Sequence, residues 1–193
     1  PPEMTKLMTY GCLILLFAVS LSSCKSDKKD KGSEESIEVI QDSNPVKMKG
    51  EEVTYKADTT MMKGYIAHNS SLESKRPGII VVHEWWGHDD FARQKADELA
   101  ELGYVALAVD MYGNGKQLEH PDEAMEFSSS VMKNFDTAKK RFNAALETLK
   151  ANENVNPDQI SAIGFCFGGS IALSMANAGA DLDAVAVFHS GLG

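Results

Sequence analysis

Cys166 is the residue whose neighbours most directly indicate chemistry. It lies two positions after Gly164 and two before Gly168, between the run 160–163 and a stretch of small residues. A nucleophile flanked by glycines is typical of the elbow between a strand and a helix, where glycines permit a strained conformation and close packing. The helix N-terminus then favours a thiolate, and the N–H of Phe167 can stabilise an oxyanion. The alternative is a buried structural cysteine, but the two glycines favour a nucleophile.

A second group of polar and aromatic residues, with the sequence His-Glu-Trp-Trp-Gly-His, occupies positions 83–88. Its histidines are five positions apart, about 140° around a helix, so they do not match the zinc-binding HExxH helix. We expect no metal or cofactor. If the preceding strand neighbours the elbow, Glu84 can reach the thiol and the N–H of Trp85 can supply a second oxyanion donor. The two tryptophans fit apolar packing and a substrate wall equally well.

The elements that must position these residues alternate between strand and helix patterns. Residues 53–57 and 62–67 predict an antiparallel hairpin around a turn at 58–60. Further strands are predicted at 79–82, 104–109, 160–163 and 182–188, and helices at 90–102, 121–132, 136–149 and 167–178. The run 79–82 is apolar and β-branched throughout, as in a strand buried on both faces of a parallel sheet. The alternation predicts an α/β fold with helices on both faces of the sheet.

Together these motifs resemble the dienelactone hydrolase family of α/β-hydrolases. The resemblance covers about 51–193 and is carried by Val-His-Glu-Trp-Trp-Gly at 82–87, Ala-Glu-Leu-Gly-Tyr-Val-Ala-Leu-Ala-Val-Asp-Met-Tyr-Gly at 100–113 and Ile-Gly-Phe-Cys-Phe-Gly-Gly at 163–169. It implies an α/β-hydrolase-type, mostly parallel sheet and a Cys-His-Asp triad with Cys166 as nucleophile. It also implies that Glu84 contacts the thiol and helps to control its ionisation, and that Trp85 and Phe167 form the oxyanion hole.

Two departures from the family pattern affect the expected substrate and activity. The family's best-known members cleave a cyclic enol-lactone and hold its carboxylate with arginines, but Gly-Asn-Gly at 113–115 stands where one of those arginines belongs. We therefore expect a different ester or lactone. The triad Asp and His follow the nucleophile in this fold, yet only 27 residues follow Cys166, and His189 comes earlier than the family histidine. We expect the triad Asp and His to lie outside this chain, the fold to be incomplete on its C-terminal side, and this chain alone to be inactive.

The N-terminal residues predict export and lipid anchoring. Residues 1–3 precede Met4 as read-through, and the apolar run 7–21 is shorter than the roughly 20 residues that span a bilayer, as in an export signal. Leu-Ser-Ser-Cys at 21–24 resembles a bacterial lipobox with Cys24 as the lipidation site; a plain signal peptide is the alternative. We expect three parts: signal 1–24, charged flexible tether 25–50 and hydrolase-like domain 51–193. The predicted location is the bacterial cell envelope, lipid-anchored on the periplasmic or outer-membrane face.

Composition and charge narrow the possible functions. The chain has 19 Lys and Arg against 28 Asp and Glu, a net charge of −9, which argues against a nucleic-acid partner. Three cysteines cannot form a disulfide framework, and Cys12 would leave with the signal. Two functions remain: a thiol hydrolase of small esters or lactones acting through an acyl-enzyme, and a non-catalytic lipoprotein that binds a small ligand in the same crevice. The only membrane association expected is through the lipid anchor.

Overall fold

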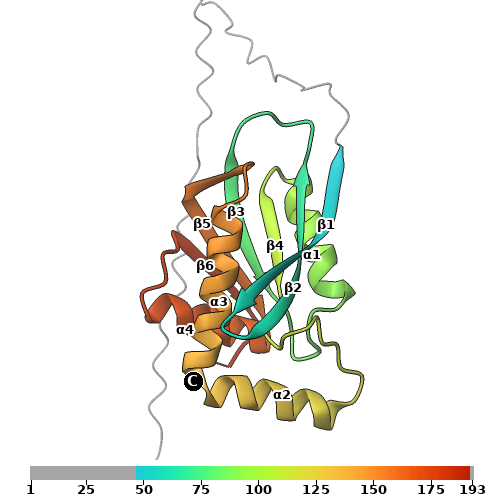
Figure 1. Ribbon diagram of the computed structural model, residues 1–193, viewed down its shortest axis with the longest axis vertical. Helices are drawn as coiled ribbons and strands as arrows, with labels where there is room; N and C mark the ends of the chain where they lie inside the picture. Colours follow the sequence, from blue (N-terminus) through green and yellow to red (C-terminus); the bar gives the residue numbers. More distant parts are fainter. Residues whose placement is uncertain (1–46, 192–193) are drawn as a thin grey trace, which may run out of the picture. The chain divides into compact units, whose positions relative to one another are not determined.

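A mixed, mostly parallel sheet forms the centre of the fold. The computed structural model describes residues 47–191, which form six strands and four helices (Figure 1). The strands are β1 (Met48–Ala57), β2 (Thr60–Asn69), β3 (Arg76–Val82), β4 (Val105–Val109), β5 (Val155–Phe165) and β6 (Ala184–Phe188). The helices are α1 (Asp90–Glu101), α2 (Pro121–Lys133), α3 (Phe135–Lys150) and α4 (Phe167–Asn177). The predicted α/β class is confirmed.

The strand order in the sheet is β1-β2-β4-β3-β5-β6. The β1–β2 hairpin is antiparallel, as predicted, and β2 is also antiparallel to β4. The remaining pairs, β4–β3, β3–β5 and β5–β6, are parallel. β3 lies between two parallel neighbours inside the sheet, and helices cover both of its faces, which explains its continuous apolar run.

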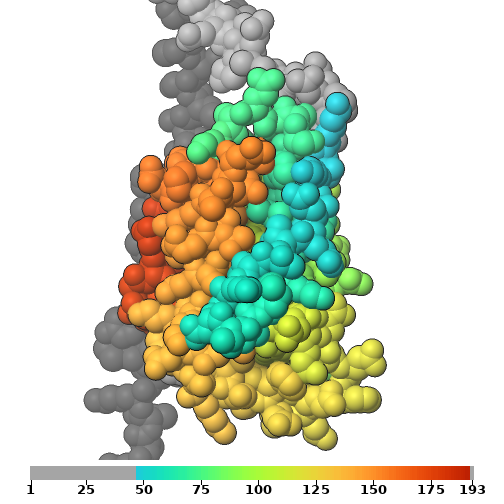
Figure 2. All heavy atoms as spheres, in the orientation of Figure 1, coloured from blue at the N-terminus to red at the C-terminus, as the bar shows by residue number. Residues whose placement is uncertain are grey.

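Helices cover the two faces of the sheet separately. On one face, Ile79 and Val81 pack with the alanines of α1, Ala92, Ala96 and Ala100. On the other, Ile80 and Val82 belong to a larger core that contains side chains of α3 and α4. Alternate residues of β3 therefore serve opposite cores, as a strand's two-residue period requires. In the space-filling view, α3 and the β1–β2 hairpin lie side by side on the face toward the viewer (Figure 2).

The parallel strands bring three loops to one edge of the sheet. Val82 pairs with Gly164, so the segment that follows β3 lies beside the turn that follows β5. Phe165 pairs with Phe188, so the residues after β6 reach the same edge. Helix α2 lies across this edge (Figure 1). The topology thus gathers residues 83–90, Cys166 and His189 in one place.

The β6 side of the sheet is less covered than its centre. No strand pairs with the outer side of β6 within residues 47–191, and the Phe188 side chain is 47% exposed. The sheet therefore looks incomplete at this edge.

Within residues 47–191, no helix is long and apolar enough to cross a membrane.

Candidate active site

The turn at Cys166 has the geometry of a nucleophile elbow. Cys166 has φ 52° and ψ −116°, in the left-handed half of backbone space that a non-glycine residue rarely adopts, and it is the N-cap of α4. A Cβ added at Gly164 would lie 2.2 Å from the Gly168 carbonyl oxygen, and one at Gly168 would lie 2.3 Å from the Val82 carbonyl oxygen. Both predicted elbow glycines are therefore required for α4 to pack against β3 and β5.

A pocket opens beside the Cys166 thiol. Its volume is about 280 Å³, and Cys166, a free and partly exposed cysteine, forms part of its wall. The other lining residues come from the loop after β3, from α2, from α4 and from the segment after β6: Trp85, Ser128, Ser129, Met132, Phe167, Ser170 and Gly191. Trp85 lines the pocket, and Trp86 packs edge-on against it with ring centroids 5.1 Å apart. A ligand in this pocket would contact one thiol, several hydroxyls and apolar rings.

The two predicted oxyanion donors line this same pocket. Phe167 is the first residue of α4, so its N–H has no acceptor within the helix. Trp85 lies in the loop after β3. Within residues 47–191, neither the Phe167 N–H nor the Trp85 N–H donates to a protein acceptor. Both groups are thus available to a ligand oxygen, although their role as an oxyanion hole remains a prediction.

Glu84 is hydrogen-bonded to His189, a residue that the sequence did not predict to be functional. Its Oε1 lies 3.0 Å from His189 Nε2. His189 directly follows β6 and has a positive φ of 40°. The structure thus joins Glu84 to His189, and the predicted contact of Glu84 with the thiol stays a prediction. The signal that could have found His189 is its position just after a strand parallel to β5.

A buried histidine connects the loop after β3 to the loop after β4. His83 is fully buried, its Nδ1 donates to the Glu84 carbonyl oxygen, and its Nε2 accepts the Met111 N–H at 3.1 Å. Burial lowers the pKa of His83, so its ring is neutral and the two partners fix which nitrogen carries the proton. The ring also stacks on Phe167, with centroids 5.8 Å apart. His83 therefore packs against Phe167 and holds the Glu84–Trp85 peptide that carries the Trp85 N–H.

The loop after β4 is held by one buried carboxylate. Asp110 is fully buried and accepts four backbone N–H groups, from Lys63 (3.1 Å), Tyr112 (2.9 Å), Gly113 (2.7 Å) and Gly115 (2.7 Å). Residues 113–115 all have positive φ, with values of 96°, 58° and 68°. The family resemblance predicts an arginine in this segment. Residues 113–115 instead form a tight turn around Asp110.

The remaining site predictions concern the N-terminus and metals. The predicted lipidation site Cys24 and the export signal lie outside the described residues. Within residues 47–191, no group of three or more His, Cys, Asp or Glu side chains is arranged to hold a metal ion.

Comparisons with known proteins identify the family. The family model for the dienelactone hydrolase family matches residues 62–192. The chain is 32% identical over 145 residues to Protein usf of Aquifex pyrophilus, covering 72% of this chain and 61% of that protein. It is 30% identical over 131 residues to a putative carboxymethylenebutenolidase of Aquifex aeolicus, covering 66% of this chain and 55% of that protein.

A solved structure is similar over the same part of the chain. It is a dienelactone hydrolase-like promiscuous phosphotriesterase from metagenomic libraries, with 34% identity and a TM-score of 0.72 over 75% of this chain and 60% of that one. The chain thus spans between 55% and 61% of the length of these relatives. Because the family model covers well over half of the chain, the chain belongs to the dienelactone hydrolase family.

Proposed function

We propose that this protein cleaves carboxylic esters or lactones through an acyl-enzyme formed on Cys166. The observation that carries the proposal is the position of Cys166. The residue has a strained backbone at the N-terminus of α4 and lines a pocket with Trp85 and Phe167, whose N–H groups have no acceptor within residues 47–191. Membership of a family whose relatives carry the name carboxymethylenebutenolidase supports the same reaction class.

In the first step, the Cys166 thiolate attacks the carbonyl carbon of the substrate. A carbon–sulfur bond forms, and the carbonyl π electrons move to oxygen, where the Trp85 and Phe167 N–H groups stabilise the negative charge. When the tetrahedral intermediate collapses, the carbon–oxygen bond to the leaving alcohol breaks and a thioester remains. An ester fits this nucleophile better than an amide, because an alkoxide or phenolate leaves more readily than an unprotonated amine.

In the second step, water hydrolyses the thioester. A base removes a proton from water, hydroxide adds to the thioester carbon, and the carbon–sulfur bond breaks to regenerate the thiolate. We assign this base to no residue between 47 and 191. The acylation step alone is therefore the part of the reaction that we assign to this chain.

The substrate that we propose is small and lacks a carboxylate. A pocket of about 280 Å³ holds only a small acyl group and its leaving group. Its lining contains three serines, a methionine, Trp85 and Phe167, none of which pairs with an anion as an arginine would. The loop after β4 is closed around Asp110, and its residues 113–115 include no arginine that could pair with a carboxylate. These features support a neutral ester or lactone.

The test is a burst experiment with p-nitrophenyl acetate in excess over the 193-residue chain. We expect one p-nitrophenol per chain in the burst, and slow or absent turnover afterwards. Cys166→Ala should lose the burst, while Cys12 and Cys24 remain in that variant and so measure non-specific acylation. An equal burst in both proteins would reject the proposal. Normal binding of a small ester by a chain that shows no burst would favour the non-catalytic alternative.

We also propose that the mature protein is anchored to the bacterial cell envelope through lipidated Cys24. The support is the sequence alone: an apolar run that ends in Leu-Ser-Ser-Cys. Radiolabelled palmitate should enter the wild-type protein in a bacterial host and should not enter Cys24→Ser. Equal labelling of the two proteins would show that Cys24 is not the acceptor.

A further inference from the structure

Tyr112 connects Trp85 and Phe167, the two pocket-lining residues that we propose as oxyanion donors. Its hydroxyl donates to the Trp85 carbonyl oxygen at 2.8 Å. Its ring packs against the Phe167 ring, with centroids 5.6 Å apart, and edge-on against His83 at 4.9 Å. Only 6% of Tyr112 is exposed, so water does not readily replace this hydrogen bond. One side chain thus touches both sides of the predicted oxyanion hole.

The hydrogen bonds around Trp85 fix the direction of its N–H. The Trp85 N–H belongs to the same planar peptide unit as the Glu84 carbonyl, which accepts the His83 ring N–H. The next peptide unit contains the Trp85 carbonyl, which accepts the Tyr112 hydroxyl. Both peptide planes that flank Trp85 are therefore held. Without the Tyr112 hydroxyl only the first plane would be held, and the backbone at Trp85 would have more freedom to turn its N–H.

The Tyr112 hydroxyl has the properties of a permanent donor. Burial raises the pKa of Tyr112 well above its ordinary value; a hydrogen bond with Ser128 lowers it by less, and the charge of an ionised Cys166 raises it. The hydroxyl therefore keeps its proton when the thiolate forms, and the hydrogen bond to Trp85 persists through the reaction.

From this geometry we infer that Tyr112 is a positioning residue for the oxyanion hole. Its hydroxyl aims the Trp85 N–H and its ring supports Phe167, while Tyr112 itself does not touch the substrate. The inference rests on the proposed function, because an oxyanion hole matters only if Cys166 attacks a carbonyl. It assigns to the hydroxyl a role in acylation and none in the reactivity of the thiolate.

Two reactions of Cys166 distinguish a role of Tyr112 in acylation from a role in the reactivity of the thiolate. Acylation by p-nitrophenyl acetate passes through a tetrahedral oxyanion, whereas alkylation by iodoacetamide is a direct displacement of iodide by sulfur that creates no oxyanion. A misaligned oxyanion donor slows only the first reaction. A change in thiolate content or pocket access slows both.

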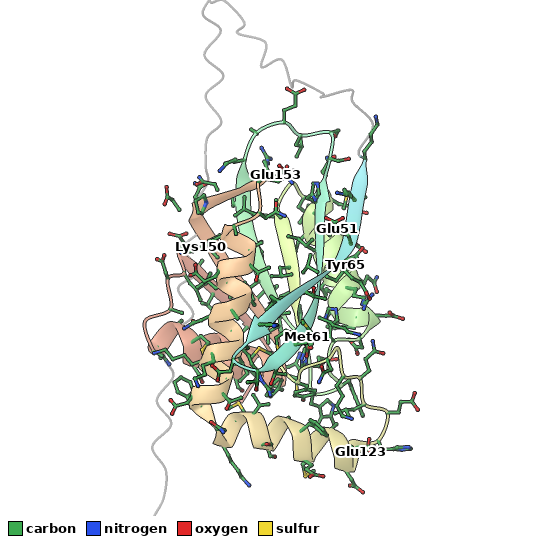
Figure 3. All side chains as sticks on the ribbon, in the orientation of Figure 1. Glu51, Met61, Tyr65, Glu123, Lys150 and Glu153 are labelled. Carbon is green, nitrogen blue, oxygen red and sulfur yellow. The ribbon has the colours of Figure 1, made fainter. Side chains whose placement is uncertain are left out.

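The experiment measures both rates on the Cys166 peptide of the full chain by mass spectrometry, for wild type, Tyr112→Phe and Tyr65→Phe. Tyr65 is the matched control, because it lies on β2 (Figure 3) and its hydroxyl donates to Asp97 at 2.9 Å, in contact with α1 and away from the pocket. We expect Tyr112→Phe to slow acylation about tenfold, less than the roughly 10²-fold or more that removal of a donor costs. Alkylation should stay within about twofold of wild type, and Tyr65→Phe should match wild type in both reactions.

Three results would overturn the inference. Tyr112→Phe could acylate at the wild-type rate, it could slow acylation and alkylation equally, or Tyr65→Phe could show the same selective loss. A wild-type chain that is alkylated at Cys166 but never acylated there is a different result: it would reject the proposed function, and the role of Tyr112 with it.

Discussion

The carboxylate of Glu84 and the imidazole of His189 lie 3.0 Å apart, although 105 positions separate them in the chain. Glu84 follows β3 and His189 follows β6, and both of these strands are parallel to β5, which lies between them and leads into Cys166. The backbone N–H of Cys166 donates to the Phe188 carbonyl oxygen at 3.0 Å, so the elbow is tied to the residue before His189. The parallel sheet thus places a carboxylate, an imidazole and a thiol at one edge.

Glu84→Gln tests whether this carboxylate accepts the thiol proton. Replacement by a neutral amide of the same shape removes the proton acceptor, and we expect Cys166 alkylation by iodoacetamide at pH 7 to fall about tenfold or more. His189→Gln is the control, because it removes the imidazole and keeps the carboxylate; it should keep at least about half of the wild-type rate. A faster rate in Glu84→Gln would instead mean that the Glu84 charge only repels the thiolate.

Gly168→Ala should destabilise the elbow. Its new Cβ would lie 2.3 Å from the Val82 carbonyl oxygen, and a backbone atom cannot move aside as a side chain can. We expect a loss of about 3 kcal/mol or more in the free energy of unfolding, measured with urea. In Gly179→Ala the new Cβ has no neighbour within 4 Å and only the positive φ of 79° is strained, so the loss should be about 1–2 kcal/mol. Equal losses would mean that α4 does not need the close approach to β3.

Asp110→Asn should loosen the loop after β4. The amide nitrogen would replace one carboxylate oxygen and face two backbone N–H donors without accepting them, so we expect a loss of about 3 kcal/mol in unfolding free energy. Asp58→Asn is the matched control, because Asp58 is exposed and pairs with Lys140 on the surface. It should cost less than about 1 kcal/mol. A cost for Asp110→Asn as small as that of Asp58→Asn would show that the four backbone hydrogen bonds are not needed for the fold.

His88 should make the folded chain sensitive to mild acid. The side chain is fully buried, and neither ring nitrogen has a partner within residues 47–191. Burial, followed by the neighbouring His83 and Arg93 side chains, lowers the pKa of His88 from 6.5 to about 4. Below pH 6.5 the unfolded chain therefore binds a proton that the folded chain does not. Stability is complete above pH 6.5 and falls as the pH drops toward about 4, with a loss of roughly 2 kcal/mol between pH 7 and pH 5.

Urea unfolding at the two pH values checks this prediction. His88→Leu should remove roughly 2 kcal/mol of the difference between pH 7 and pH 5, and the remainder belongs to the buried His83, whose pKa burial also lowers. His120→Gln, at an exposed position, should leave the difference unchanged. If the wild type were equally stable at both pH values, or if His88→Leu kept the full difference, the acid sensitivity would not come from His88.

The elements nearest the site could be predicted from the sequence because their signals are local. The uniform apolar run at 79–82 predicted β3. The glycines around Cys166 predicted the order strand, turn and helix that β5 and α4 form. The polar start of β1 at Met48 was not predicted, because its side chains are exposed and show no apolar alternation. The start of β5 at Val155 was also not predicted, because Asn-Pro-Asp at 156–158 is typical of a turn. In the sheet this segment is accommodated by a register shift against Pro77 and Gly78.

The contacts that complete the candidate site could not be predicted in this way. The Tyr112 hydroxyl reaches the Trp85 carbonyl only because β3 and β4 end side by side, and that pairing depends on the strand order. Ser128 and Ser129 reach the pocket only because α2 crosses the edge of the sheet. Neither relationship has a signal in the spacing of residues, since each depends on how distant elements pack.

The most direct test of the central claim is the mass of the Cys166 peptide after the chain reacts with p-nitrophenyl acetate and is quenched in acid. We expect one acetyl group on Cys166, formed at the same rate as the p-nitrophenol burst. The burst should be lost in Cys166→Ala. A burst of undiminished size in Cys166→Ala, with no acetyl group on Cys166 in the wild type, would show that Cys166 is not the nucleophile.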